Sequence, residues 1–277
     1  MMISEKATNQ KNICQFSKTN MKHQISIFAA VFTALFLAGC TETKVQLVLS
    51  PSGIELFHDK KQTLIVTGAG QNIEWETTND FIAQVENGEV TGNHVGECAV
   101  SVKSNGDIAT CNVVVKPKYF TYKEPVLEWG ITLEQLKAQK GEYNDHSQNK
   151  GKDLYYYVQD KENGIIELYT FADDVLENCS VMLNVKNTDV TDFLIERYQP
   201  ISYDEETGLA LFINSMELEM ATLGVGLRPV VSGSTAMFLV TYLPYSDSKS
   251  PSMAPTRISA TENYCLEFVE KYFLERK

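Results

Sequence analysis

Short apolar segments separated by turn residues, with no helical spacing among them, constrain the fold of residues 45–116 more than any other feature. The segments 98–103 and 108–115 flank Ser104-Asn105-Gly106-Asp107, and another Asn-Gly dipeptide stands at 87–88. Asn-Gly between alternating apolar residues is a strong short-range signal of a β-hairpin, because both positions accept a positive φ. The regular spacing of these strands predicts a β-sandwich.

An apolar run from Ile25 to Leu37 precedes this region and leads into Ala38-Gly39-Cys40. Lys22 and His23 stand before the run. A cationic start, a short apolar run and small residues are typical of a secretory signal, and a membrane span would need about 20 apolar residues. Leu-Ala-Gly-Cys resembles the lipobox of bacterial lipoproteins. The resemblance implies that Cys40 is acylated and holds the protein on a membrane, outside the cytoplasm, on the outer membrane or cell surface.

The sequence divides into four expected parts. Residues 1–20 are polar and without periodicity, so we expect translation to start at Met21; a cytoplasmic tail on a membrane-spanning helix is the alternative that the short apolar run disfavours. Residues 21–40 form the signal peptide. Residues 41–117 form the sandwich, and residues 118–277 form a second domain of a different kind.

The charge of the expected mature chain excludes some partners. Of the 24 basic and 36 acidic residues, four and one respectively precede Cys40, which leaves a formal charge of −15. Such a chain repels phosphate backbones, so nucleic-acid binding is not expected. It also repels anionic lipid, so the acyl chains on Cys40 must provide the membrane attachment.

The order of residues in the sandwich resembles the bacterial immunoglobulin-like family, group 2. The matching stretches are 73–76, 82–85, 87–92, 96–102 and 112–115. The resemblance implies an all-β Ig-like sandwich that acts as a spacer or adhesive module and is not catalytic. Trp75 is then expected to be a central core residue; the alternative is an exposed platform that stacks on sugars.

Residues 118–277 mix helix and strand signals and predict an α+β domain of two helix-plus-antiparallel-strand units and a final helix. Thr132 and Gln135 form a capping-box pattern. We expect a polar loop at 142–151, a strand at 217–223, a connection at 224–234, a mobile loop at 246–255 and the final helix from Thr261. We expect this final helix to dock on the sheet. The start of the domain resembles the BamE-like and β-lactamase-inhibitor-protein folds, and the whole arrangement resembles uncharacterised surface lipoproteins of gut Bacteroidetes.

Tyr155, Tyr157 and Tyr169 are the candidate ligand-binding aromatics. Strand geometry sends Tyr155 and Tyr157 to one face, and Tyr169 extends that face on the next strand. If helices cover the opposite face, an exposed tyrosine ladder remains for a glycan or a surface protein. The alternative is that the rings lie beneath a second layer of structure.

Four cysteines follow Cys40, and an even number permits two disulfides in an oxidising compartment. Cys98 and Cys111 share the inner face of one hairpin but stand two residues out of register, so a bond and two buried thiols are both open. Cys179 and Cys265 are the second candidate pair.

No catalytic residue, metal site or cofactor is expected. His146 lies in a polar segment without a Gly-x-Ser-x-Gly nucleophile elbow in the chain. The sequence therefore predicts a lipid-anchored binding or adhesion protein that is not an enzyme. A secreted hydrolase acting on glycans or peptides, with its site in 118–277, is the alternative; the oligomeric state is left open.

Overall fold

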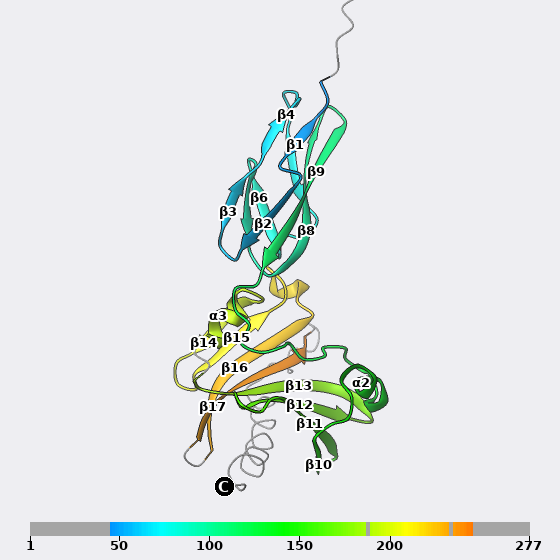
Figure 1. Cartoon of the computed structure of the whole chain (residues 1–277), viewed down its shortest axis with the longest axis vertical. Coiled ribbons are helices and arrows are strands. Elements are labelled where there is room, and N and C mark those ends of the chain that lie inside the picture. The colour runs from blue at the N-terminus through cyan, green and yellow to red at the C-terminus, as the bar shows by residue number, and fades with distance from the viewer. Residues whose placement is uncertain (1–44, 187–188, 233–234, 246–277) are drawn as a thin grey trace, which may run out of the picture. The chain divides into compact units, whose positions relative to one another are not determined.

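The computed structural model describes residues 45–186, 189–232 and 235–245. The helices and strands that it describes lie between Val48 and Pro244 (Figure 1). The signal peptide, Cys40, the loop at 246–255 and the final helix expected from Thr261 lie outside the described residues.

The first nine strands form sheets of four, three and two strands that share one core. Their bounds are β1 Val48–Ser50, β2 Gly53–Phe57, β3 Lys61–Thr63, β4 Ile65–Thr67, β5 Glu74–Thr77, β6 Ala83–Glu86, β7 Glu89–Gly92, β8 Gly96–Ser104 and β9 Asp107–Lys116. The strand orders are β2-β9-β8-β5, β3-β7-β6 and β1-β4, and all pairs are antiparallel except β2 with β9.

Two Asn-Gly turns close hairpins where the sequence predicts them. Asn87 and Gly88 join β6 to β7, and Asn105 and Gly106 join β8 to β9, all four with φ between 51° and 83°. These are the left-handed conformations that a two-residue hairpin turn requires. The alternation along β8 and β9 then points every second residue into the core.

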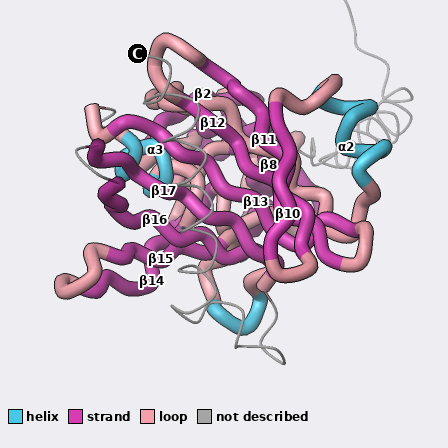
Figure 2. Tube along the Cα trace, turned by 90° about the horizontal axis from the view of Figure 1, so that it is seen from below, coloured by secondary structure: helices cyan, strands magenta, loops and turns pink. Residues whose placement is uncertain are grey.

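Residues 118–245 build one antiparallel sheet of eight strands, ordered β10-β11-β12-β13-β17-β16-β15-β14 (Figures 1 and 2). The strands are β10 Asp145–Asn149, β11 Lys152–Asp160, β12 Ile165–Ala172, β13 Val175–Asn184, β14 Gln199–Asp204, β15 Leu209–Ile213, β16 Leu223–Ser232 and β17 Thr235–Pro244. The helical elements described are α2 Leu133–Lys140, α3 Val190–Ile195 and the 3-10 turn Leu218–Met220.

The helix α2 begins with the capping box that the sequence predicts. The Thr132 side chain accepts from the backbone of Gln135, and the Gln135 side chain accepts from the backbone N–H of Thr132. Gly141, with a φ of 85°, ends the helix. Leu136 from α2 and Phe193 from α3 both enter the core on the same face of the eight-stranded sheet.

That sheet is buried on both faces. One face carries a row of residues paired across six strands, namely Tyr155, Tyr169, Cys179, Tyr242, Val225 and Phe212. The other face carries a second buried cluster that includes Leu168, Met182 and Leu239. In β12, seven successive residues are buried, which is the pattern of a strand covered on both sides.

The fold class expected from the sequence is wrong. The described residues are mostly β, with two short α-helices and one large sheet, and this does not fit an Ig-like sandwich followed by an α+β domain of several helices. The segment 145–149, expected to be a loop, is the edge strand β10. The segment 224–232, expected to be a connection, is part of β16, and the expected strand at 217–223 contains a 3-10 turn. The pairing of β13 with β17 joins the two expected units into one sheet.

Candidate ligand-binding groove

The tyrosines proposed as a ligand-binding ladder lie mainly in the core. Tyr155 pairs with Tyr169 in register, so the three rings do share a face. However, α2 and α3 cover that same face, which leaves Tyr157 5% and Tyr169 0% exposed. Only Tyr155 remains partly accessible. The sequence could not reveal this, because strand alternation does not say which face a helix will cover.

Tyr155 belongs to an aromatic cluster at the β10 edge of the sheet. The ring of His146 stacks on Tyr155 with centroids 4.6 Å apart, and Tyr143 lies 4.9 Å from Tyr155. The His146 Nε2 atom lies 2.9 Å from Asp153 Oδ1. The neighbouring hydroxyl of Ser147 points away from this pair and contacts the hydroxyl of Tyr156 at 3.2 Å. The arrangement therefore contains a paired histidine without the adjacent nucleophile that a hydrolytic triad needs.

A charged group is buried behind Tyr157 and Tyr169. The Glu167 side chain is 1% exposed, and its carboxylate contacts Lys140 Nζ at 2.5 Å. It also accepts hydrogen bonds from Tyr169 at 2.6 Å and from Gln159 at 2.5 Å. Burial raises the pKa of Tyr157 to about 12 and raises that of Tyr169 above its ordinary range. Both hydroxyls stay protonated, as donors in a structural network.

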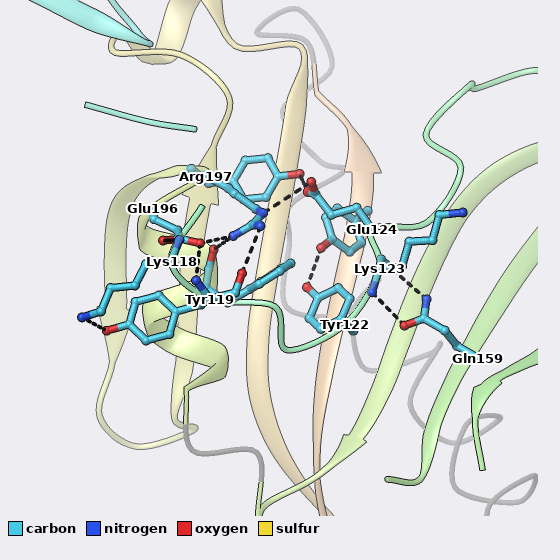
Figure 3. A network of polar contacts seen from close by, with 11 residues as sticks. Lys118, Tyr119, Tyr122, Lys123, Glu124, Gln159, Glu196 and Arg197 are labelled. Carbon is cyan, nitrogen blue, oxygen red and sulfur yellow. Dashed lines mark hydrogen bonds and ion pairs between the residues drawn. The ribbon is translucent and has the colours of Figure 1, made fainter. Parts of the chain in front are cut away.

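The segment after β9 is fastened to the sheet by a second polar network (Figure 3). The buried carboxylate of Glu196 accepts from the backbone N–H of Lys118 at 2.9 Å and of Tyr119 at 3.1 Å. The guanidinium of Arg197 lies between Glu196 and Glu124 and donates to the Tyr119 carbonyl at 3.2 Å. Glu196 and Arg197 thus satisfy backbone groups of a chain segment that belongs to no strand or helix.

The same segment is held at two further points. The hydroxyl groups of Tyr122 and Tyr242 are 2.6 Å apart within the core. Gln159 accepts from the Lys123 N–H at 2.8 Å and donates to the Lys123 carbonyl at 2.7 Å. These polar groups form hydrogen bonds within the protein, so we do not assign them a ligand.

Three cysteines among the described residues are free thiols: Cys98, Cys111 and Cys179. Cys98 pairs with Val113, and Val100 pairs with Cys111, which is the offset of two residues that the sequence indicates. Burial raises the pKa of all three thiols. Cys265 lies outside the described residues.

A solvent-open groove of about 410 Å³ lies among the sheets that β1 to β9 form. Trp75 is the largest side chain that lines it. The lining residues come from strands β3, β5, β6 and β7 and are Lys61, Trp75, Glu76, Thr77, Gln84, Val85, Glu86, Glu89 and Thr91. β5 ends the four-stranded sheet and β6 ends the three-stranded sheet. Lys61, Thr91 and Gln84 are partners in register across three strands, so they form one polar row.

Trp75 is only partly buried, although the sequence predicts a central core position. It pairs with the buried Val102 and packs against the core that the sheets of β1 to β9 share. Its position at the end of a sheet leaves part of the ring accessible. A Cβ atom placed on Gly88 would lie 3.0 Å from Trp75 Cζ2. The glycine at this turn therefore lets the ring lie directly against the backbone.

Ion pairs compensate most of the charge in the groove. Lys61 Nζ contacts Glu89 at 2.6 Å, and Lys103, just outside the groove, contacts Glu76 at 2.5 Å. The hydrogen bond to Glu89 raises the pKa of Lys61, so this ammonium remains charged. The arrangement offers paired donors and acceptors beside an aromatic ring. The sequence indicates Trp75 only as an alternative exposed platform and does not predict the polar lining, because these residues converge from separate strands of two sheets. The alternation of Gln84 and Glu86 is the local signal of an exposed polar strand face.

Within the described parts of the chain, no group of three or more His, Cys, Asp or Glu residues is placed to hold a metal ion. No helix there has the length and hydrophobicity to cross a membrane.

Comparisons with known proteins give little guidance. No family model matches the chain, and no curated protein matches it. One similar solved structure is a cysteine-rich secretory protein from Staphylococcus aureus subsp. aureus Mu50, with 11% identity over 46% of each chain and a TM-score of 0.24. Another is an extracellular protein containing a SCP domain from Bacillus anthracis str. Ames, with 14% identity over 51% of this chain and 53% of that chain, and a TM-score of 0.24. The chain spans about half the length of each of these solved structures.

Proposed function

We propose that this chain is a lipid-anchored, extracytoplasmic protein of the bacterial outer membrane or cell surface, which binds a ligand without transforming it. The groove at Trp75 carries the proposal, because it combines an accessible aromatic ring with fixed polar groups on a rigid sheet scaffold. The segment Leu37-Ala38-Gly39-Cys40 supports the anchor, since it resembles the lipobox of bacterial lipoproteins, in which the cysteine is acylated.

Fatty-acid labelling tests the anchor. The full chain is expressed in a bacterium fed an alkyne-bearing fatty acid, beside a Cys40→Ala variant. We expect label on the wild-type membrane fraction and none on the variant. Equal labelling of both chains, or an unmodified Cys40 thiol in the purified protein, would contradict the anchor.

Binding and turnover are separated by a second measurement. The purified full chain is incubated with polysaccharides and peptides of bacterial and host surfaces, and both bound material and released products are quantified. Retention without product formation supports a binding protein. Product that disappears in a single carboxylate variant would instead support a hydrolase.

A further inference from the structure

We infer that the groove at Trp75 binds a neutral oligosaccharide, with one sugar ring lying against the exposed part of the indole. The inference rests on the proposed binding function and adds the chemical class of the ligand.

The first argument is the position of the aromatic ring. Trp75 is anchored at its base, where its strand pairs with the buried Val102, and its six-membered ring abuts the turn at Gly88. A ring held at two points loses little side-chain entropy when a ligand covers it. A flat, partly exposed indole is suited to the apolar face of a sugar, which buries C–H groups and leaves the hydroxyls free.

The second argument is the charge balance of the groove. Glu89 and Glu76 are each held by a lysine, at 2.6 Å and 2.5 Å. The third lining carboxylate, Glu86, also acts on Lys61 and raises its pKa through its negative charge. A strongly cationic ligand would have to displace Lys61 and Lys103 from their carboxylates. An anionic ligand would meet the acidic groups of a chain whose formal charge is −12. A neutral ligand meets neither cost.

The third argument is the supply of hydrogen-bonding groups. The polar row of Lys61, Thr91 and Gln84 provides ammonium, hydroxyl and amide groups at successive strands. The Lys61 ammonium has three N–H donors and Glu89 does not use them all, so a ligand hydroxyl can bind there without breaking the ion pair. Vicinal hydroxyl groups of a sugar match such alternating donors and acceptors.

Tryptophan fluorescence tests the inference directly, because the chain contains only two tryptophans. The variant Trp129→Phe leaves Trp75 as the sole indole. The full chain is purified in a polyoxyethylene detergent that contains no sugar and is titrated with short neutral glucans, mannans, xylans and galactans. Oligolysine and oligogalacturonate serve as the charged probes. We expect saturable changes in Trp75 emission with at least one neutral oligosaccharide.

The affinity should show the signature of an uncharged contact. Raising NaCl from about 50 to about 500 mM should change the dissociation constant by less than about twofold, because screening acts on charges. Trp75→Ala should weaken binding at least about tenfold. Because Trp75 also packs against the core, Gln84→Ala provides a surface variant that should weaken binding about threefold with an unchanged melting temperature. Gln148→Ala, an exposed glutamine on β10, is the matched control and should retain wild-type affinity.

Three results would overturn the inference. These are no emission change with any neutral probe, unchanged affinity in both Trp75→Ala and Gln84→Ala, and preferential binding of oligolysine that falls with salt and in Glu86→Gln. The last result would identify a cationic peptide as the ligand. If envelope material is retained equally by wild type and Trp75→Ala, the proposed binding function stands and only the assignment to this groove fails.

Discussion

Lys140 and Glu167 form an ion pair at 2.5 Å beneath the tyrosine face of the eight-stranded sheet. Lys140 is the last residue of α2, and Glu167 lies in the middle of β12. The ammonium group also lies 5.3 Å and 5.5 Å from the ring centroids of Tyr157 and Tyr169, where the ring faces attract a cation. This pair connects a helix end to a central strand and explains how a carboxylate can be 1% exposed.

Removing the cation should be strongly destabilising. Lys140→Met leaves Glu167 buried without its positive partner, and such changes cost about 3–5 kcal/mol. Equilibrium urea unfolding of the full chain should therefore show a large fall in midpoint. Lys137→Met is the matched control on the same helix, because Lys137 contacts the exposed carboxylates of Glu134 and Glu142; it should cost less than about 1 kcal/mol.

The double variant Lys140→Met/Glu167→Met separates charge from packing. It should recover part of the loss, because the uncompensated carboxylate is removed with the lysine. Equal stability of Lys140→Met and wild type would show that the hydrogen bonds from Gln159 and Tyr169 are enough to stabilise the buried Glu167 carboxylate.

Glu196 should control the order of the segment that follows β9. In Glu196→Ala the N–H groups of Lys118 and Tyr119 lose their acceptor, so we expect their amide hydrogen exchange to accelerate about tenfold or more, as expected for roughly 1.5 kcal/mol of lost protection. Glu205→Ala, at an exposed turn, should leave exchange of these amides unchanged. Slow exchange at both amides in Glu196→Ala would contradict the role assigned to this carboxylate.

Stability should fall under mild acid because of His94. Burial lowers the pKa of His94 below 6.5, opposed in part by the hydrogen bond with the Phe81 carbonyl at 2.7 Å. The nearby His58 also lowers this pKa, and Asp59 raises it. The folded protein thus binds fewer protons than the unfolded chain. The resulting stability is fully present above pH 6.5 and is lost as pH falls through the folded-state pKa.

Thermal melts at pH 7 and pH 5 measure this effect. His94→Phe keeps an aromatic ring beside Phe81, which stacks on His94 at 4.0 Å, and removes the titration. Its melting temperature should fall less between the two pH values than that of the wild type. Equal slopes for the wild type and His94→Phe would refute the assignment to His94.

The described thiols should differ in reactivity. Cys98 is partly exposed, whereas Cys111 and Cys179 are buried, and the reactive thiolate is disfavoured at each because burial raises its pKa. Iodoacetamide labelling followed by peptide mass spectrometry should modify Cys98 slowly in the folded protein and Cys179 only after denaturation. Labelling of Cys179 as fast as Cys98 without denaturant would be inconsistent with the buried position.

Several local elements were predictable from the sequence because neighbouring residues specify them. The capping box at Thr132 and the turns at Asn87 and Asn105 depend on side chains within a few positions of one another. The strands β11, β12 and β13 are likewise visible locally, since β-branched and aromatic residues are frequent in them.

The polar strand β10 was not predictable in this way. Its residues Asp145–Asn149 have no apolar alternation, and they form a strand because their backbone groups pair with β11. The same applies to β16, where Gly224 and Gly226 weaken the local strand signal but ten residues pair with β17. Such pairing satisfies backbone hydrogen bonds regardless of side-chain pattern.

The sequence by itself determined the Asn-Gly turns, the capping box of α2, the alternation that puts Tyr155, Tyr157 and Tyr169 on one face, and the pattern around Cys40. Only the tertiary structure decided that helices cover that tyrosine face and that Trp75 lies beside an open groove. The physical reason is that alternation and capping act between neighbours along the chain, whereas burial depends on which distant surfaces meet.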